Sequence, residues 1–177
     1  YLKGSNYTAN AYGHQKVVFS TPGNINAQYA KNIIFDGNIF SHLGGVGLML
    51  GKGSHNNLIS NNTFTDISSA AIQIGGVSEA DLRPDANSLV SSNQIINNDI
   101  SYTGRDYYDT AGIYVGFAAQ TLIKNNSISH TPWSGIAIGW GWGLFDIDGF
   151  PGLPHANWNE WGSYSTPTIM KNNQIIS

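Results

Sequence analysis

The sequence predicts an all-β solenoid, a coil of short strands stacked in about five to six rungs. One phrase, with asparagines between short apolar stretches, returns at 32–40, 57–64, 92–100, 121–128 and 168–175. A second phrase, with alternating apolar residues and a final glycine, occurs between these copies at 47–51, 71–75, 112–116 and 135–139. Short strands that repeat at a regular interval are typical of solenoid proteins, in which each turn of chain stacks on the one before it.

The composition agrees with stacked rungs and excludes several classes of protein. Charged residues make up 11% of the chain, against about 25% in an average soluble protein. Stacking places like side chains about 4.8 Å apart, where charges repel one another and asparagines form hydrogen bonds. The net charge of −3 without a basic run argues against nucleic acid as a partner, and the chain has no cysteine for disulfides or thiolate metal sites. No apolar run approaches the roughly 20 residues of a membrane span, so no membrane partner is expected.

The second phrase predicts strands with one apolar face. Alternation directs one set of residues into the interior, where they should form ladders: Leu48, Leu50, Ile72, Ile74, Ile113, Val115, Ile136 and Ile138. The residues between them should point outward in one column: Met49, Gln73, Tyr114 and Ala137.

The first phrase predicts two short strands joined at a tight corner. The first strand should direct Ile34, Ile59, Ile123 and Ile169 inward. The second should direct inward either Ile39 or Phe40, and then Phe64, Ile100, Ile128 and Ile175. The asparagine pairs between the strands mark the corner, because asparagine tolerates left-handed backbone angles and can bond its own backbone.

Three insertions interrupt the repeat and indicate where a binding site lies. They cover residues 77–88, 104–110 and 143–167, and each adjoins the second phrase. Stacked in register, they should gather on one flank of the solenoid, and such insertions commonly build the binding face of a repeat protein. Residues 1–177 are expected to form a single segment of a longer protein. Its ends, which lack polar caps, should be covered by more of that chain or by a partner chain.

Acidic residues in these insertions are the candidates for catalysis. Asp106 and Asp109 lie in the second insertion, and Asp146 and Asp148 lie in the third. Two carboxyl groups across a cleft are what glycoside hydrolysis requires, one to protonate the leaving oxygen and one to act as nucleophile or as base on water. Three other aspartates, Asp36, Asp66 and Asp99, fall at rung corners and are interpreted as turn formers.

Aromatic residues beside the acidic ones point to a sugar ligand. All five tryptophans fall between Trp133 and Trp161. Indole rings combine a flat apolar face with a polar N–H, which suits the C–H face of a sugar ring. The expected substrate-binding residues are Trp133, Trp140, Trp142, Trp158, Tyr108, Tyr114, Gln73 and His155.

The rungs resemble the right-handed parallel β-helix of the pectate-lyase-like superfamily. Four stretches, at 21–24, 40–44, 108–113 and 132–143, are similar to bacterial β-helix glycosidases that include α-L-fucosidases and xylanases. The most specific is Ser-Gly-Ile-Ala-Ile-Gly-Trp-Gly-Trp, which begins at Ser134. The resemblance implies one acidic residue near the Gly-Ile strand, which is Asp109 or Asp106. It implies a second after the tryptophan run, which is Asp148 or Asp146.

The expected function is therefore hydrolysis of a plant-type polysaccharide, without cofactor or metal, by a secreted, periplasmic or surface protein of bacterial type. A non-catalytic β-helix, either carbohydrate-binding or structural as in an adhesin or a phage spike, is the alternative. A third possibility is a calcium-dependent polysaccharide lyase. That enzyme would need at least three converging carboxylates with Arg83 or Arg105 close by.

Overall fold

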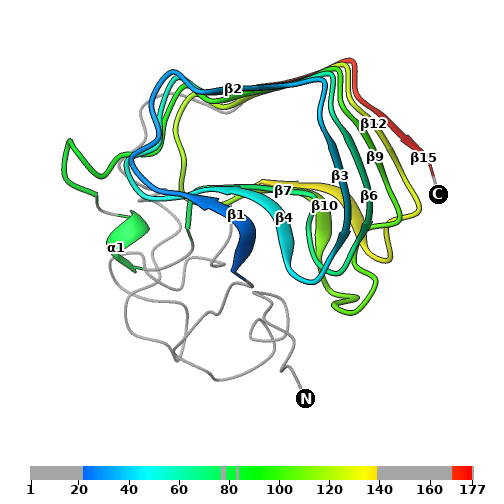
Figure 1. The fold of residues 1–177 in the computed structure, drawn as a ribbon. Helices are drawn as coiled ribbons and strands as arrows, with labels where there is room; N and C mark the ends of the chain where they lie inside the picture. Colours follow the sequence, from blue (N-terminus) through cyan, green and yellow to red (C-terminus); the bar gives the residue numbers. More distant parts are fainter. Residues whose placement is uncertain (1–21, 77–78, 83, 139–168, 177) are drawn as a thin grey trace, which may run out of the picture.

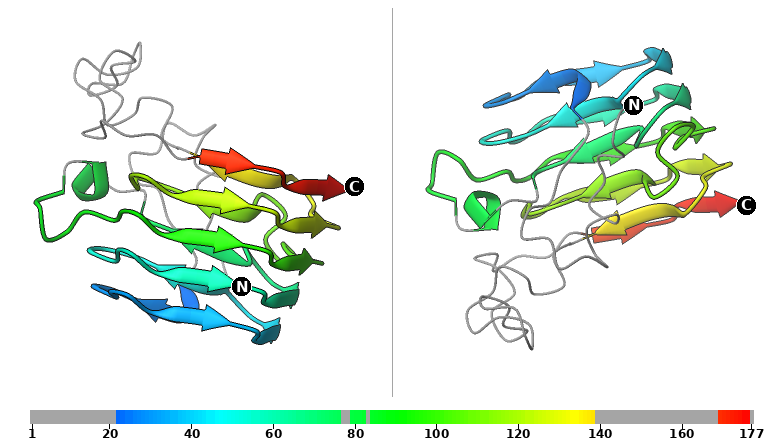
Figure 2. Two further views of the ribbon diagram at one scale, coloured as in Figure 1. Left: turned by 90° about the horizontal axis from the view of Figure 1, so that it is seen from above. Right: turned by 90° about the horizontal axis from the view of Figure 1, so that it is seen from below.

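The computed structural model describes residues 22–76, 79–82, 84–138 and 169–176. In this part the chain coils through five rungs, and each rung contributes one strand to each of three parallel sheets (Figure 1). Seen from the side, the strands of successive rungs lie above one another along the solenoid axis (Figure 2). The all-β parallel solenoid predicted from the repeats is confirmed, with one short helix, α1 (Glu79–Leu82), in the described residues.

Each sheet collects the strands from one side of the solenoid. The first sheet contains β1 (Gly23–Ala27), β4 (Val46–Leu50), β7 (Ile72–Ile74), β10 (Ala111–Val115) and β13 (Ser134–Ile138). The second contains β2 (Ile34–Asp36), β5 (Leu58–Ser60), β8 (Gln94–Ile96), β11 (Leu122–Lys124) and β14 (Ile169–Lys171). The third contains β3 (Ile39–Leu43), β6 (Thr63–Ile67), β9 (Asp99–Ser101), β12 (Ser127–Ser129) and β15 (Gln174–Ile176).

Apolar ladders fill the interior between the three sheets. In the first sheet, Leu48, Ile72 and Ile113 stand in register and are fully buried. In the third sheet, the ring of Phe40 stacks on that of Phe64 with centroids 4.3 Å apart, which settles the choice between Ile39 and Phe40. The predicted ladders of the second phrase are confirmed, except that Ile138 is 38% exposed on the last strand of its sheet.

The predicted inward residues of the second sheet need a correction. Phe35, not Ile34, stands in register with Ile59, and Ile34 is 66% exposed. Likewise Met170, not Ile169, pairs with Ile123. A one-residue shift turns every side chain of a strand to its other face, so a short apolar run does not reveal its own orientation.

The asparagine pairs form the corner between the second and third sheets, as predicted. The first residue of each pair has left-handed backbone angles, with φ of 54° at Asn61, 57° at Asn97 and 56° at Asn125. The second residues form a ladder of five asparagines, in which the side-chain Nδ2 of each of the first four donates to Oδ1 of the asparagine one rung on: Asn38, Asn62, Asn98, Asn126 and Asn173. The first asparagine of each pair therefore forms the turn, and the second connects neighbouring rungs.

The second insertion and all of the first except residues 77, 78 and 83 lie within the described residues, and both border the first sheet. The first follows β7 and includes α1, and the second precedes β10, so they adjoin opposite ends of these strands (Figure 1). The third insertion, 143–167, lies outside the described residues. No helix in the described ranges has the length and apolar character needed to cross a membrane.

Candidate functional site

A second column of left-handed residues lies at the corner between the third and first sheets. It consists of His42, Asp66, Tyr102 and His130, with φ between 52° and 56°. The residues immediately before them pair in register between neighbouring strands of the third sheet. The four residues of the column therefore stack on four consecutive rungs. The left-handed angle turns the chain sharply and leaves these side chains on the surface.

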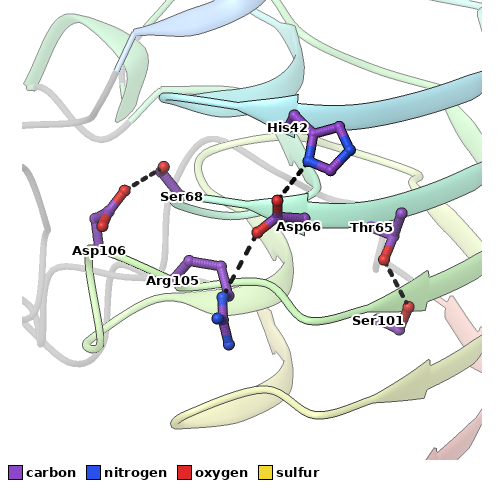
Figure 3. Close-up of polar contacts among 7 residues, drawn as sticks. All are labelled: His42, Thr65, Asp66, Ser68, Ser101, Arg105 and Asp106. Carbon is purple, nitrogen blue, oxygen red and sulfur yellow. Dashed lines mark hydrogen bonds and ion pairs between the residues drawn. The ribbon is translucent and has the colours of Figure 1, made fainter.

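Asp66 occupies the centre of a small polar cluster in this column. Its Oδ2 lies 2.6 Å from Nδ1 of His42, and its Oδ1 lies 3.6 Å from Nε of Arg105 (Figure 3). The side chains are 80% exposed at His42, 46% at Asp66 and 57% at Arg105. Exposed ion pairs contribute little to stability, so the main effect of these contacts is to orient the Asp66 carboxylate.

Asp106 is held next to this cluster by the preceding rung. The Ser68 hydroxyl donates to its Oδ2 at 2.5 Å (Figure 3), and the Asp106 backbone N–H donates to the Ser68 carbonyl at 3.2 Å. The insertion begins at Gly104, which has a φ of 66° and no room for a side chain, because a Cβ there would lie 2.4 Å from Pro132. Buried Tyr107 anchors the segment on its other side. The carboxyl group of Asp106 therefore stands on a fixed backbone.

These residues line an open pocket of about 390 Å³ on the outer corner of the solenoid. Its lining comes from three consecutive rung junctions: His42, Leu43, Gly44, Asp66, Ser68, Arg105 and Asp106. The pocket thus combines two carboxyl groups, one guanidinium group, one imidazole and one hydroxyl. This set can bind several hydroxyl groups of a ligand and can place two carboxyl groups beside it.

The family model for a right-handed β-helix region matches residues 2–109, which is more than half of the chain. This chain belongs to the right-handed β-helix family. The match fixes the hand and type of the solenoid, and the three parallel sheets agree with it. Neither the curated proteins nor the solved structures give a match to this β-helix protein.

The β-helix places only some of the expected site residues within the described part of the chain. Asp106 lines the pocket, while Asp109 and Tyr108 lie in the same insertion, half-buried and 71% exposed respectively, outside the lining. Trp133 is 50% exposed just before β13. The remaining candidates lie outside the described residues, so their pairing with Asp106 or Asp109 stays a prediction: Asp146, Asp148, Trp140, Trp142, His155 and Trp158.

Gln73 and Tyr114, which were expected to point outward and to bind substrate, are both buried. Their exposed fractions are 3% and 2%, and Gln73 Nε2 donates to the carbonyl of Gly75. All five residues of β10 are buried, so this strand is covered on both faces, as parallel strands often are. Ala137, further along the same column, is half-buried.

The sequence interpretation missed the contribution of Asp66, His42 and Ser68 to the pocket. Asp66 is a turn former, as predicted from its place in the repeat, but its side chain also lines the pocket. A signal was available, because His42 and Asp66 are 24 residues apart, the same interval that separates the stacked Asn38 and Asn62. Residues separated by the same interval as a stacked pair are expected to stack in a column of their own.

The lyase alternative requires at least three converging carboxylates. Within the described ranges, no group of three or more histidine, cysteine or acidic residues is arranged to hold a metal ion. Arg105 is present in the pocket, beside two carboxylates. Arg83 lies outside the described residues.

Proposed function

We propose that this β-helix protein is a glycoside hydrolase that acts on a neutral polysaccharide at the pocket between the third and first sheets. One observation carries the proposal: Asp66 and Asp106, from successive rung junctions, line the same open pocket. Two carboxyl groups beside one ligand are the minimum that acid–base cleavage of a glycosidic bond requires.

The contacts of the two carboxyl groups favour different roles. Both oxygens of Asp66 face a partner, His42 on one side and Arg105 on the other. Asp106 receives the Ser68 hydroxyl on Oδ2, and its Oδ1 has no hydrogen-bond partner among the described residues. Asp106 is therefore the better candidate for direct reaction with the sugar. Asp66 would place negative charge near the positive charge that develops on the ring.

The charge of the pocket favours a neutral ligand. Two carboxylates and one guanidinium group leave a net charge of −1 when His42 is neutral. This charge repels the carboxylate of a uronic acid. The carboxylates can instead accept hydrogen bonds from sugar hydroxyl groups, and the serine hydroxyl can both donate to them and accept from them. A neutral plant-type polysaccharide is thus preferred over the acidic substrate of a lyase.

A carbohydrate-binding role without catalysis is the second candidate. The observation that favours it is the openness of the site, where the side chain of His42 is 80% exposed. Enzymes commonly enclose the reacting atoms and keep out all water that does not take part in the reaction, whereas a binding module needs only surface contacts. The two roles differ in one measurable respect, because only the hydrolase releases new reducing ends.

The test is an activity assay of the full-length protein against a panel of neutral polysaccharides. Asp106→Asn should lower turnover by about 100-fold or more, the usual size of an acid–base contribution, and leave the melting temperature nearly unchanged. Asp36→Asn, which alters an exposed aspartate of β2 in the second sheet, outside the pocket lining, is the matched control and should keep full activity.

The other outcomes separate the competing assignments. If Asp109→Asn abolishes turnover and Asp106→Asn does not, the reacting group is Asp109, with its partner in the third insertion. Binding of a polysaccharide without release of reducing ends would identify a carbohydrate-binding module. A protein that neither binds nor cleaves any member of the panel would contradict both candidates.

A further inference from the structure

We infer that the asparagine ladder is also a chemical shield, which keeps the exposed asparagines at the rung corners from deamidating. These corner asparagines are latent modification sites, because their side chains are open to solvent while the backbone that would react with them is held. The inference concerns the solenoid itself and does not rest on the proposed carbohydrate function.

Deamidation of asparagine begins when the backbone nitrogen of the next residue attacks the side-chain Cγ. The new N–Cγ bond closes a succinimide ring, the Cγ–Nδ2 bond breaks, and the N–H proton leaves with ammonia. Water then opens the ring to aspartate or to isoaspartate, in which the main chain runs through Cβ and Cγ. The reaction makes asparagine one of the thermolabile residues of proteins. It requires that the next N–H is free to lose its proton and that its peptide plane can turn towards the side chain.

Exposed asparagines with left-handed backbone angles stand at five corners where this reaction could start: Asn32, Asn56, Asn61, Asn97 and Asn125. At each of these corners the N–H of the next residue donates to Oδ1 of an asparagine on the following rung. The N–H···Oδ1 bonds are 2.9–3.1 Å long, and their acceptors are, in the same order, Asn57, Asn93, Asn98, Asn126 and Asn173. The sixth left-handed asparagine, Asn172, lies on the last described rung.

The corner at Asn97 shows how firmly the attacking nitrogen is held. The backbone N–H of Asn98 and its side-chain Nδ2 both donate to Oδ1 of Asn126, each at 2.9 Å. The peptide plane between Asn97 and Asn98 therefore cannot turn without breaking the first of these bonds. Asn126 is 1% exposed, so water does not readily replace it as the acceptor. The side chain of Asn97 is itself exposed, which leaves the backbone as the part that limits the reaction.

The test measures deamidation site by site in the folded full-length protein at mildly alkaline pH, by peptide mapping and mass spectrometry. Each rate is divided by the rate of the same site in urea-unfolded protein, which removes the effect of the neighbouring sequence. Asn126→Ala removes the acceptor of the Asn98 N–H and should raise the normalised rate at Asn97 about five- to tenfold, the factor equivalent to one hydrogen bond. Asn125 should stay slow, because the N–H of residue 126 still has Oδ1 of Asn173 as its acceptor.

Ile128→Ala is the matched control for a general loosening of the same rung. Ile128 is fully buried in β12, so its truncation should destabilise the protein while every ladder contact remains. The normalised rate at Asn97 should then stay close to that of the parent. If Asn126→Ala fails to fold, Asn173→Ala is the second variant. Asn173 is half-buried, and loss of its Oδ1 should accelerate Asn125 but not Asn97.

The pattern of rates decides the inference. Acceleration at Asn97 without acceleration at Asn125 in Asn126→Ala protein would support it. An unchanged rate at Asn97 would overturn it and show that the left-handed backbone alone prevents the reaction. Equal acceleration at Asn97 and Asn125, or an Ile128→Ala protein that deamidates at Asn97 as fast as Asn126→Ala, would also overturn it. In both cases the loss of rigidity, and not the loss of one acceptor, would be what admits the reaction.

Discussion

At the scale of single residues, this β-helix uses small polar side chains to hold its surface as well as its corners. Asp36 shows how: its Oδ1 accepts hydrogen bonds from Ser60 Oγ at 2.6 Å and from Asn61 Nδ2 at 2.7 Å. These bonds, with that from Ser60 the larger influence, lower the pKa of Asp36 below its ordinary value. One carboxylate thereby connects the first rung to the second.

This contact makes a prediction about pH. Because the pKa is lower in the folded protein, ionised Asp36 stabilises the fold above its unfolded pKa, and the stabilisation is lost as pH falls through the folded pKa. Asp36→Asn should therefore unfold at lower urea concentration than the parent at neutral pH, and the two should converge in strong acid. In a Ser60→Ala background the neutral-pH difference should shrink. A difference that stays constant at all pH values would contradict this explanation.

At the scale of elements, the asparagine ladder decides the register of each rung. Counting back three residues from Asn38, Asn62, Asn98, Asn126 and Asn173 gives the inward residues of the second sheet, namely Phe35, Ile59, Ile95, Ile123 and Met170. The predictions for Ile34 and Ile169 were wrong because they followed the apolar run instead of this count. The fold could be predicted because it depends on the period, whereas the face of a three-residue strand depends on its distance from the corner.

The ladder should contribute measurably to stability. Asn126 is 1% exposed; its Nδ2 donates to the Ile95 carbonyl and to Asn173 Oδ1, and its Oδ1 accepts from Asn98. Asn126→Ala leaves buried donors and acceptors unsatisfied, which costs about 1–3 kcal/mol for each such group. Denaturant melts should show at least this loss, while the exposed control Asn87→Ala should change little. An unchanged melt for Asn126→Ala would mean that the ladder is not a stabilising element.

At the scale of the whole molecule, the site is less predictable from sequence than the fold. Asp106 could be placed near a site because it lies in an insertion. The pocket itself joins residues from three rung junctions, from His42 to Asp106, and only stacking brings these together. The buried state of Gln73 and Tyr114 likewise depends on what packs outside the first sheet. Residues that recur at equal intervals in the sequence can be assigned to one column of the solenoid. The insertions change these intervals, so the sequence does not show which residues on either side of an insertion become neighbours.

Stacking also predicts how the effect of a destabilising substitution should spread through the molecule. Ile113 in β10 is fully buried and pairs with Ile72 in β7 and Ile136 in β13. Ile113→Ala should lower the free energy of unfolding by about 2–5 kcal/mol, from lost burial and the cavity left behind. Ile138→Ala, at a site already 38% exposed, should lower it less.

In a solenoid each rung contacts only its neighbours, so a substitution in one rung should destabilise the adjacent rungs first. Hydrogen exchange should therefore quicken in β7, β10 and β13 before it does in β1 and β4, which lie further along the stack. Equal acceleration in all five strands would show instead that the solenoid opens as one cooperative unit, and the rung-by-rung description of its stability would be wrong.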